Sequence, residues 1–307
     1  MCRVHIPNAT AFTHALETTD KLMDERAALR MLAADLPHAG DDAAVVDSTA
    51  ITTDMLHEST DFPDGTTHYT AGWRSVAASL SDLAAMGATP TAVVAAYADT
   101  EFVEDELQAF VEGARGVCEQ TTAEYVGGDL DAHCELTVTS TAIGEVDEPV
   151  YRSGATPGEV VCVTGTLGRS AAALALFESG DHEQANELFR FSPRIAAGRQ
   201  LAGTATAMMD SSDGLARSLH QLAEASDCGF AVDSSAVPID DAVESCEDRW
   251  EAGVHFGEDF ELVCTLPEAA LDAVQRDLKV PLTVIGEVTD SGVTVDGEPL
   301  ADRGYTH

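Results

Sequence analysis

The chain has 307 residues and a formal net charge of −38, with 54 acidic against 16 basic residues. Its hydrophobic share of 45% is ample for a folded core, which excludes an intrinsically disordered acidic protein. The negative charge also argues against nucleic acid or an anionic membrane as a partner. No apolar run approaches the length of a transmembrane helix.

Lysine is almost absent, since only Lys21 and Lys279 occur, and the acidic residues are spread along the chain rather than gathered in a tail. This composition indicates a salt-adapted cytoplasm, where molar salt shortens the Debye length to about 3 Å and screens self-repulsion. The 7 cysteines include no C-x-x-C pair. We therefore expect a reduced cytoplasmic protein with mostly buried thiols, and neither a disulfide scaffold nor a zinc site.

The N-terminal region divides into a polar start and a helix. Residues 1–22 are polar and aperiodic, and we predict that they form a disordered extension. A helix is expected over about 24–35. One hypothesis is that translation begins at Met23, which directly precedes that helix.

A β-hairpin is predicted next, because two short β-prone runs, 44–46 and 50–53, flank the turn residues 47–49. A turn centred on Ser48 would place Asp42 opposite Asp54, with Val46 paired to Ala50. Like charges that face each other across a ladder are destabilising. These carboxylates are therefore either fully solvated or gathered around hard cations such as Mg²⁺, which take oxygen ligands.

The remaining pattern predicts two α/β halves without the regular βαβ rhythm of a doubly wound sheet. We place the halves at 23–148 and 149–307, because 144–158 is rich in glycine, proline and charge. Gly87 is expected to end the first long helix. Helices are expected at about 70–86, 104–118, 170–177, 196–201 and 214–225, and strands at 91–97, 135–143, 160–164, 204–209, 229–232, 260–265 and 283–288.

Several familiar catalytic motifs are missing. There is no G-x-x-x-x-G-K-[ST] loop, no protein-kinase signature and no G-x-S-x-G elbow. If the chain transfers phosphoryl groups, metal ions and a few arginines must meet the phosphate charge. Asp82 fits such a site, because a carboxylate between Leu80 and Leu83 in a small, apolar helix needs a partner.

Three further residues or pairs have two interpretations each. Asp213 could cap the helix that follows it, or the same helix N-terminus could hold a phosphate with Ser212. Gly127-Gly128 could be a turn or a place where the backbone approaches a ligand. Arg152 could grip a phosphate or form a surface ion pair.

Taken together, seven motifs in chain order resemble the thiamine-monophosphate kinase family, which belongs to the aminoimidazole ribonucleotide synthetase-like superfamily. The motifs are G-D-D-A-A at 40–44, T-T-D at 52–54, S-D-L-A-A-M-G at 81–87, G-G-D at 127–129, R-S-G at 152–154, S-D-G-L at 212–215 and G-E-D-F-E-L at 257–262. The resemblance implies an α/β (α+β) fold of two domains, an N-terminal domain that dimerises through its sheet and a C-terminal mixed α/β domain.

The resemblance also implies roles for individual residues. Asp61 stands where the family has a substrate-contacting histidine, Glu258 matches a contact to the thiamine moiety, and Tyr305 matches an aromatic that stacks on it. No residue is implied as a covalent nucleophile. Matches to Mg²⁺ ligands are Asp42, Thr52, Thr53, Asp54, Asp82, Asp129, Asp210 and, for a further metal, Asp213; matches to ATP contacts are Gly128, Asp129, Arg152 and Ser212.

The expected activity is ATP-dependent phosphorylation of thiamine monophosphate to thiamine diphosphate, by direct in-line transfer with clustered Mg²⁺, in a cytoplasmic homodimer. Two alternatives stay open. One is another ATP-dependent enzyme of the same superfamily, such as one similar to aminoimidazole ribonucleotide synthetase. The other is a non-catalytic acidic protein that only binds cations.

Overall fold

The computed structural model describes residues 28, 31–33 and 35–304. Contacts divide the chain into a segment of residues 1–40 and a large compact unit, 41–307. The predicted extension 1–22 and most of the predicted helix 24–35 lie outside the described residues, although Ala28 and residues 31–33 are helical. No helix in the described ranges is long and apolar enough to cross a membrane.

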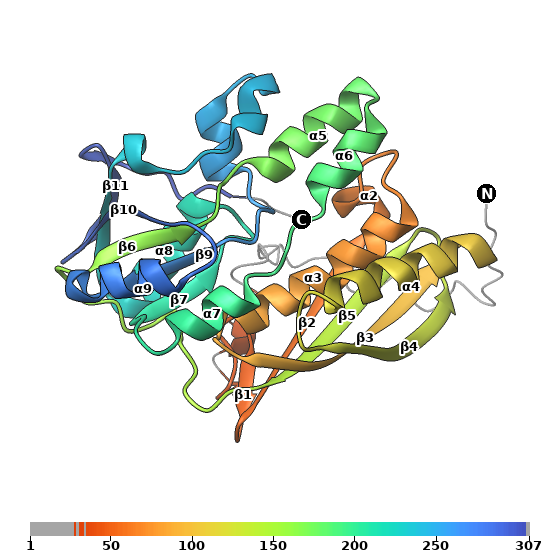
Figure 1. The fold of residues 1–307 in the computed structure, drawn as a ribbon, viewed down its shortest axis with the longest axis horizontal. Helices are drawn as coiled ribbons and strands as arrows, with labels where there is room; N and C mark the ends of the chain where they lie inside the picture. Colours follow the sequence, from red (N-terminus) through yellow and green to blue (C-terminus); the bar gives the residue numbers. More distant parts are fainter. Residues whose placement is uncertain (1–27, 29–30, 34, 305–307) are drawn as a thin grey trace, which may run out of the picture. The chain divides into compact units, whose positions relative to one another are not determined.

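The first half of the large unit is a five-stranded sheet with two long helices (Figure 1). The strand order is β1-β2-β5-β3-β4, and only β3 and β4, which α4 connects, run parallel. Its elements are β1 (Ala44–Val46), β2 (Thr49–His57), α2 (Glu58–Asp61), α3 (His68–Ala85), β3 (Thr89–Asp99), α4 (Glu104–Cys118), β4 (Glu124–Ala132) and β5 (Thr137–Glu145).

The second half holds a seven-stranded mixed sheet in the order β12-β11-β8-β10-β6-β9-β7. Strands β6, β9 and β7 are almost wholly buried, and Asp210 is the last residue of β7. The elements are β6 (Val160–Thr164), α5 (Arg169–Ser179), α6 (His182–Phe189), α7 (Ile195–Leu201), β7 (Ala207–Asp210), α8 (Leu215–Ser226), β8 (Gly229–Val232), η1 (Ser234–Ala236), η2 (Asp241–Ser245), η3 (Glu251–His255), β9 (Leu262–Leu266), η4 (Glu268–Ala270), α9 (Leu271–Asp277), β10 (Leu282–Thr289), β11 (Gly292–Val295) and β12 (Glu298–Pro299).

Helix α3 has well-defined ends and a nearly continuous buried surface. Thr67 caps its N-terminus by accepting a hydrogen bond from the N–H of Thr70 at 3.2 Å. At the other end the N–H of Ala88 donates to the carbonyl of Leu83, and Gly87 has a φ of 71°. This is a Schellman ending, which needs a left-handed residue and so confirms that Gly87 ends the helix.

Two glycines let α3 and α4 pack backbone against backbone. A Cβ built on Gly72 would lie 2.1 Å from the carbonyl oxygen of Phe110, and one on Gly113 would lie 1.9 Å from that of Tyr69. No real side chain tolerates such distances, so only glycine permits this approach. The contact fixes α3 over the inner face of the first sheet.

The outer face of the first sheet is exposed and apolar. Along β2, residues alternate between buried and exposed, and Ile51 and Met55 lie on the exposed side. Ile51 pairs with Ile143 on β5, which is also exposed, and Val94 on β3 lies in the next exposed row. Apolar side chains in register on three strands form a continuous patch of the kind that marks an interaction surface.

Candidate functional site

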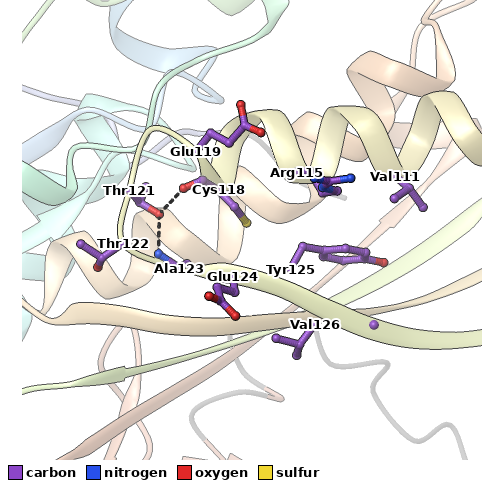
Figure 2. Close-up of a pocket in the computed structure, with 11 residues that line it drawn as sticks. Val111, Arg115, Cys118, Glu119, Thr121, Thr122, Ala123, Glu124, Tyr125 and Val126 are labelled. Atoms are coloured by element: carbon purple, nitrogen blue, oxygen red, sulfur yellow. Dashed lines mark hydrogen bonds between the residues drawn. The ribbon is translucent and has the colours of Figure 1, made fainter.

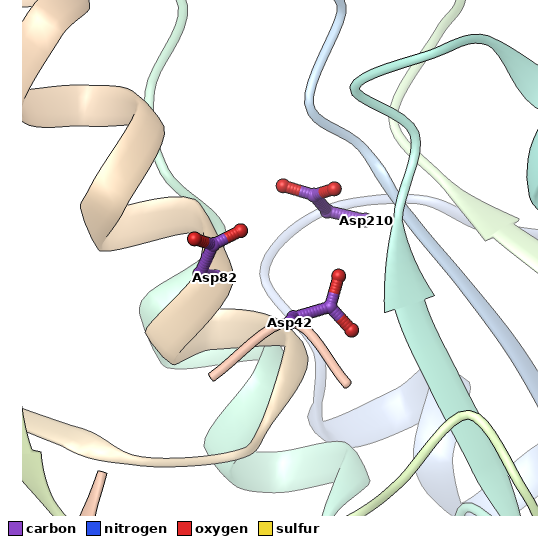
Figure 3. Close-up of side chains that lie close together, drawn as sticks. All are labelled: Asp42, Asp82 and Asp210. Atoms are coloured by element: carbon purple, nitrogen blue, oxygen red, sulfur yellow. The ribbon is translucent and has the colours of Figure 1, made fainter. Parts of the chain in front are cut away.

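Three aspartates from distant parts of the chain come together in the large unit. Asp42 precedes β1, Asp82 lies in the last turns of α3, and Asp210 ends β7. One carboxylate oxygen from each lies within 4.8 Å of the others (Figure 3). Asp42 and Asp210 are buried, and Asp82 is partly exposed. The partner that Asp82 was predicted to need is the hydroxyl of Thr52, whereas the other two carboxylates add to its negative surroundings.

Hydroxyl groups hold these carboxylates in place. Thr52 donates to Asp82, and Ser81 donates to Asp210 at 2.6 Å. A fourth carboxylate, that of Asp54, accepts from Ser79 at 2.8 Å. Helix α3 therefore orients the cluster, because it contributes one of its carboxylates and two of the donors that fix the others.

The cluster carries more negative charge than its surroundings balance. Burial, followed by the charge of Asp42, raises the pKa of Asp210 to about 7. Burial, followed by neighbouring carboxylates with Asp54 first, raises the pKa of Asp82 well above its ordinary value. Both shifts express the cost of holding like charges together in a poorly solvated place.

Among the described residues, Arg152 is a cation that faces the cluster. The guanidinium of Arg152 donates to both oxygens of Asp42, at 2.9 and 3.3 Å, and the backbone N–H of Arg152 donates to Asp41 at 2.6 Å. Burial alone would lower the pKa of Arg152, but the charge of Asp42 and their hydrogen bond raise it. Arg152 is thus fixed in a partly buried ion pair, and a single arginine leaves several carboxylates unbalanced.

The donor set fits a hard divalent cation. Oxygen atoms from carboxylates and a hydroxyl, close together and short of positive charge, are the ligands that Mg²⁺ takes. Five of the eight predicted ligands gather here, namely Asp42, Asp54, Asp82, Asp210 and the hydroxyl of Thr52.

The predicted register of the hairpin was wrong. Val46 pairs with Thr49 rather than Ala50, so the turn has two residues, and Asp47 adopts a φ of 55°. Asp42 is consequently not opposite Asp54 on a ladder. The two carboxylates approach the same cluster because Asp42 lies before the strand, where the chain bends toward Arg152.

Two predicted ligands lie away from the cluster. The hydroxyl of Thr53 points to the opposite face of β2 from Thr52 and donates to the carbonyl of Ser140 at 2.9 Å. Asp129 pairs with Ala96 and shares a cross-strand row with Met55, so its side chain belongs to the exposed face of the sheet. One chain alone does not bring Asp129 to the other carboxylates.

The Gly127-Gly128 pair is part of a strand rather than a turn. Val93 pairs with Tyr125 and Val94 with Gly127, so Val126 is an extra, bulged residue, and Gly127 has a φ of 140°. A Cβ on Gly128 would lie 1.7 Å from the carbonyl of Ala95, so the strand pairing itself requires glycine there.

A groove of about 860 Å³ lies beside this bulge, between α4 and the start of β4 (Figure 2). Its walls combine apolar side chains such as Val111 and Tyr125 with the polar groups of Arg115 and Glu119, and it ends at Gly127. The volume lies in the range of small-molecule sites. No local pattern of residues predicts this groove, because its walls come from a helix end and an edge strand.

The loop after β7 connects the cluster to a second charged region. The N–H of Ser212 donates to Asp210 at 3.3 Å, and its carbonyl accepts from the N–H of Glu258 at 2.6 Å. The N-cap of α8 is Gly214, so Asp213 is not the cap of that helix, and it lies in the turn before it. Ser212 therefore lies between Asp210 and the predicted substrate contact Glu258.

The second region surrounds Glu258. Its carboxylate pairs with the buried Arg74 of α3, and Asp61, also buried, accepts from the N–H of His57 at 2.7 Å. Tyr305, the third predicted substrate contact, lies outside the described residues. Arg74 was not predicted as a site residue. Its sequence context is nevertheless the same as that of Asp82, because both are charged residues among small and apolar ones in α3.

Comparison with known proteins identifies the fold and the family of this chain. A family model for the N-terminal domain of AIR synthase related proteins matches residues 40–146, and its C-terminal counterpart matches residues 156–297. A thiamine-monophosphate kinase of Halobacterium salinarum is 61% identical over 288 residues, covering 93% of this chain and 100% of that protein. The chain belongs to the thiamine-monophosphate kinase family. The resemblance and the two-domain fold predicted from the motifs are thereby confirmed.

Solved structures of the thiamine-monophosphate kinase family agree with this assignment. The enzyme of Stenotrophomonas maltophilia K279a has a TM-score of 0.77 at 32% identity, over 90% of this chain and 96% of that one. The structure of AaThiL complexed with AMPPCP and TMP has a TM-score of 0.85 at 27% identity, over 95% and 100% of the two chains. The Halobacterium relative also agrees with the salt-adapted composition.

Proposed function

We propose that this chain catalyses ATP-dependent phosphorylation of thiamine monophosphate to thiamine diphosphate in the cytoplasm. The observation that carries the proposal is the cluster of Asp42, Asp82 and Asp210, which joins both halves of the large unit at one place. The names of the relatives, and the AMPPCP and TMP of the AaThiL complex, support the choice of donor and acceptor.

Asp42, Asp54, Asp82, Asp210 and Thr52 would hold Mg²⁺, with Asp213 close by for a further ion. When bound, the cations would offset the mutual repulsion of the donor and acceptor phosphates. The chain's own contribution is to fix these oxygens through Thr52, Ser79 and Ser81 before substrates arrive. Positioning of this kind lowers the barrier without a protein nucleophile.

The proposed reaction is a direct in-line transfer. A phosphate oxygen of thiamine monophosphate attacks the γ-phosphorus of ATP, a new P–O bond forms, and the bond from the γ-phosphorus to the bridging oxygen breaks to release ADP. The acceptor phosphate is already ionised near neutral pH, so no side-chain base is required. Arg152, whose charge acts on Asp210, and Ser212, whose backbone N–H donates to Asp210, would bind phosphate oxygens during this exchange.

The nucleoside end of ATP would occupy the groove between α4 and β4. Its volume suits a heteroaromatic ring with a sugar, Tyr125 offers a flat surface, and the groove ends beside Gly127 and the predicted contacts Gly128 and Asp129. Because Asp129 lies on the exposed face of the sheet, its proposed part in metal and ATP binding depends on what covers that face.

We propose that a second copy of this chain covers that face, giving a homodimer. Ile51, Met55, Val94 and Ile143 expose between 38% and 55% of their surface there, in a chain that is otherwise strongly acidic. A second negatively charged chain can approach closely through such an apolar surface. Asp129 of each copy would then lie at the interface.

The direct test is product formation from ATP and thiamine monophosphate in molar KCl, with and without Mg²⁺. Thiamine diphosphate is expected only with Mg²⁺, and Asp82→Asn should lose turnover while remaining folded. The matched control is Asp47→Asn, an exposed turn residue outside the cluster. ADP without thiamine diphosphate would favour another acceptor within the superfamily, and no reaction from folded protein would favour the cation-binding alternative.

A further inference from the structure

Arg74 is among the most buried residues of the described chain, although arginine is seldom buried unless it is paired. Only 2% of its surface is exposed. Its guanidinium donates to the carboxylate of Glu258 and to the carbonyl oxygen of Phe189 at 2.5 Å, and it lies 3.6 Å above the ring of Phe189. These two hydrogen bonds and the ring contact fix the position and the orientation of the Arg74 guanidinium.

The partner of Arg74 belongs to a loop whose backbone is also fixed. Glu258 has a φ of 63°, in the left-handed region that residues other than glycine seldom adopt, and its N–H donates to the carbonyl of Ser212. The next residue, Asp259, accepts from the N–H groups at the start of α5, at 2.5 Å from Gly168 and 3.0 Å from Ser170. The side-chain direction of Glu258 is therefore set by its loop on one side and by Arg74 on the other.

Arg74 and its neighbour Trp73 also hold the segment between α6 and α7. The indole N–H of Trp73 donates to the carbonyl of Phe191 at 2.6 Å. The ring of Phe191 stacks on that of Phe260 with centroids 4.1 Å apart. Arg74 thus contacts the loop directly at Glu258, and Trp73 contacts it through Phe191, which stacks on Phe260.

The same helix reaches the carboxylate cluster two turns later. Arg74 and Ser81 are seven residues apart, which places them on one face of α3 with an axial separation of about 10 Å. Ser81 donates to Asp210, and Arg74 donates to Glu258. One rigid helix therefore sets the spacing between the metal site and the carboxylate of Glu258.

This spacing suits an acceptor with two different ends. A phosphate would lie at the cluster, and the heteroaromatic end of the acceptor would lie near the carboxylate of Glu258, whose charge Arg74 balances. A lysine at position 74 could not reproduce the contact, because its ammonium group is a point charge and cannot hold a carboxylate and a carbonyl in one plane.

We propose that Arg74 is a positioning residue that orients the carboxylate of Glu258 toward the cationic ring of the acceptor, and that it thereby determines specificity for that end of the substrate. The inference rests on the proposed function, since it assumes thiamine monophosphate as the acceptor. Arg74 acts through Glu258 and does not itself touch the substrate.

The test compares Arg74→Lys with Arg194→Lys by steady-state kinetics in molar KCl. Arg194 is the matched control because it also pairs with a buried carboxylate of the same segment, that of Glu261. For Arg74→Lys we expect KM for thiamine monophosphate to rise about tenfold while KM for ATP stays within about twofold. Arg194→Lys should not separate the two constants. Equal changes in both constants for Arg74→Lys, or no change, would overturn the inference.

A double-mutant cycle shows whether Arg74 works through Glu258. In a Glu258→Gln background, Arg74→Lys should change KM for thiamine monophosphate by less than about twofold, because the carboxylate it orients is gone. Additive effects would overturn the inference and leave only a structural role for Arg74. A wild-type chain that makes no thiamine diphosphate would instead overturn the proposed function, so the two failures are distinguishable.

Discussion

Replacing Asp82 with asparagine should make the protein more stable in the absence of divalent cations and less responsive to them. The amide keeps an oxygen that can accept the hydrogen bond from Thr52, so the local geometry survives. What disappears is one negative charge next to Asp42 and Asp210. Without cations, repulsion among the carboxylates destabilises the site. The variant reduces that repulsion at the expense of function.

The size of the effect follows from the distances within the cluster. Two unit charges of the same sign 4.8 Å apart repel by about 3.5 kcal/mol at an effective dielectric constant of about 20. Arg152 offsets part of this through Asp42. Burial, followed by the neighbouring carboxylates, raises the pKa of Asp82, and where Asp82 takes up a proton the cost of protonation replaces the repulsion. We expect a net gain of about 1–3 kcal/mol, or about 2–6 °C in Tm.

Thermal unfolding at constant molar KCl measures both effects. In EDTA, Asp82→Asn should unfold at a higher temperature than the wild type; with Mg²⁺ and ATP the wild type should rise and the variant should not. Asp47→Asn, exposed in the hairpin turn, should follow the wild type in both conditions. A variant that is less stable than the wild type in EDTA would refute the reasoning, because it would show that the carboxylate stabilises the metal-free fold.

Three further predictions concern titration, packing and assembly. Because the pKa of Asp210 is raised from 3.8 to about 7, the stability it contributes is fully present below pH 3.8 and is lost as the pH rises toward 7. Mg²⁺ competes with the proton on the Asp210 carboxylate, so calorimetry should find tighter Mg²⁺ binding at about pH 8 than at about pH 6. Equal affinities at the two pH values would contradict the raised pKa of Asp210. Gly113→Ala should destabilise the fold by about 1–3 kcal/mol in chemical unfolding despite a gain of about 1 kcal/mol in helix propensity, whereas Gly203→Ala, with no atom within 4 Å, should change it by less than about 0.5 kcal/mol. Met55→Glu should convert the proposed dimer to a monomer in light scattering at molar KCl, while Phe102→Glu, an exposed apolar site off the sheet, should not; a wild type that is already monomeric would exclude the dimer.

Elements with a strong local signal could be predicted from the sequence almost residue by residue. The helix at 104–118 and the strands at 160–164 and 229–232 have the predicted bounds, because their apolar period and flanking turn residues are local properties. Helices α6 (His182–Phe189) and α9 (Leu271–Asp277) and the strands β4, β11 and β12 were not predicted. Both helices are short, and the strands form only by pairing with distant parts of the chain.

The burial of the cysteines could be predicted only in part. All the cysteines in the described part of the chain are free, and Cys118, Cys162, Cys228 and Cys264 are buried, as the scattered spacing predicted. Burial raises the pKa of the Cys162 thiol to about 12, which makes it a core side chain rather than a reactive one. Composition indicated this behaviour without indicating which cysteines would be buried.

Sequence motifs and local periodicity are properties of short segments, and they suffice to predict the family, the two α/β halves and most of the candidate ligands. How those segments meet depends on the tertiary structure. It brought Ser81 to Asp210 across 129 positions and Arg74 to Glu258 across 184. The hairpin register also differs by one residue from the predicted register, and Asp129 lies on the exposed face of the sheet. Such contacts depend on strand pairing and on the packing of distant surfaces, which no local pattern of residues encodes.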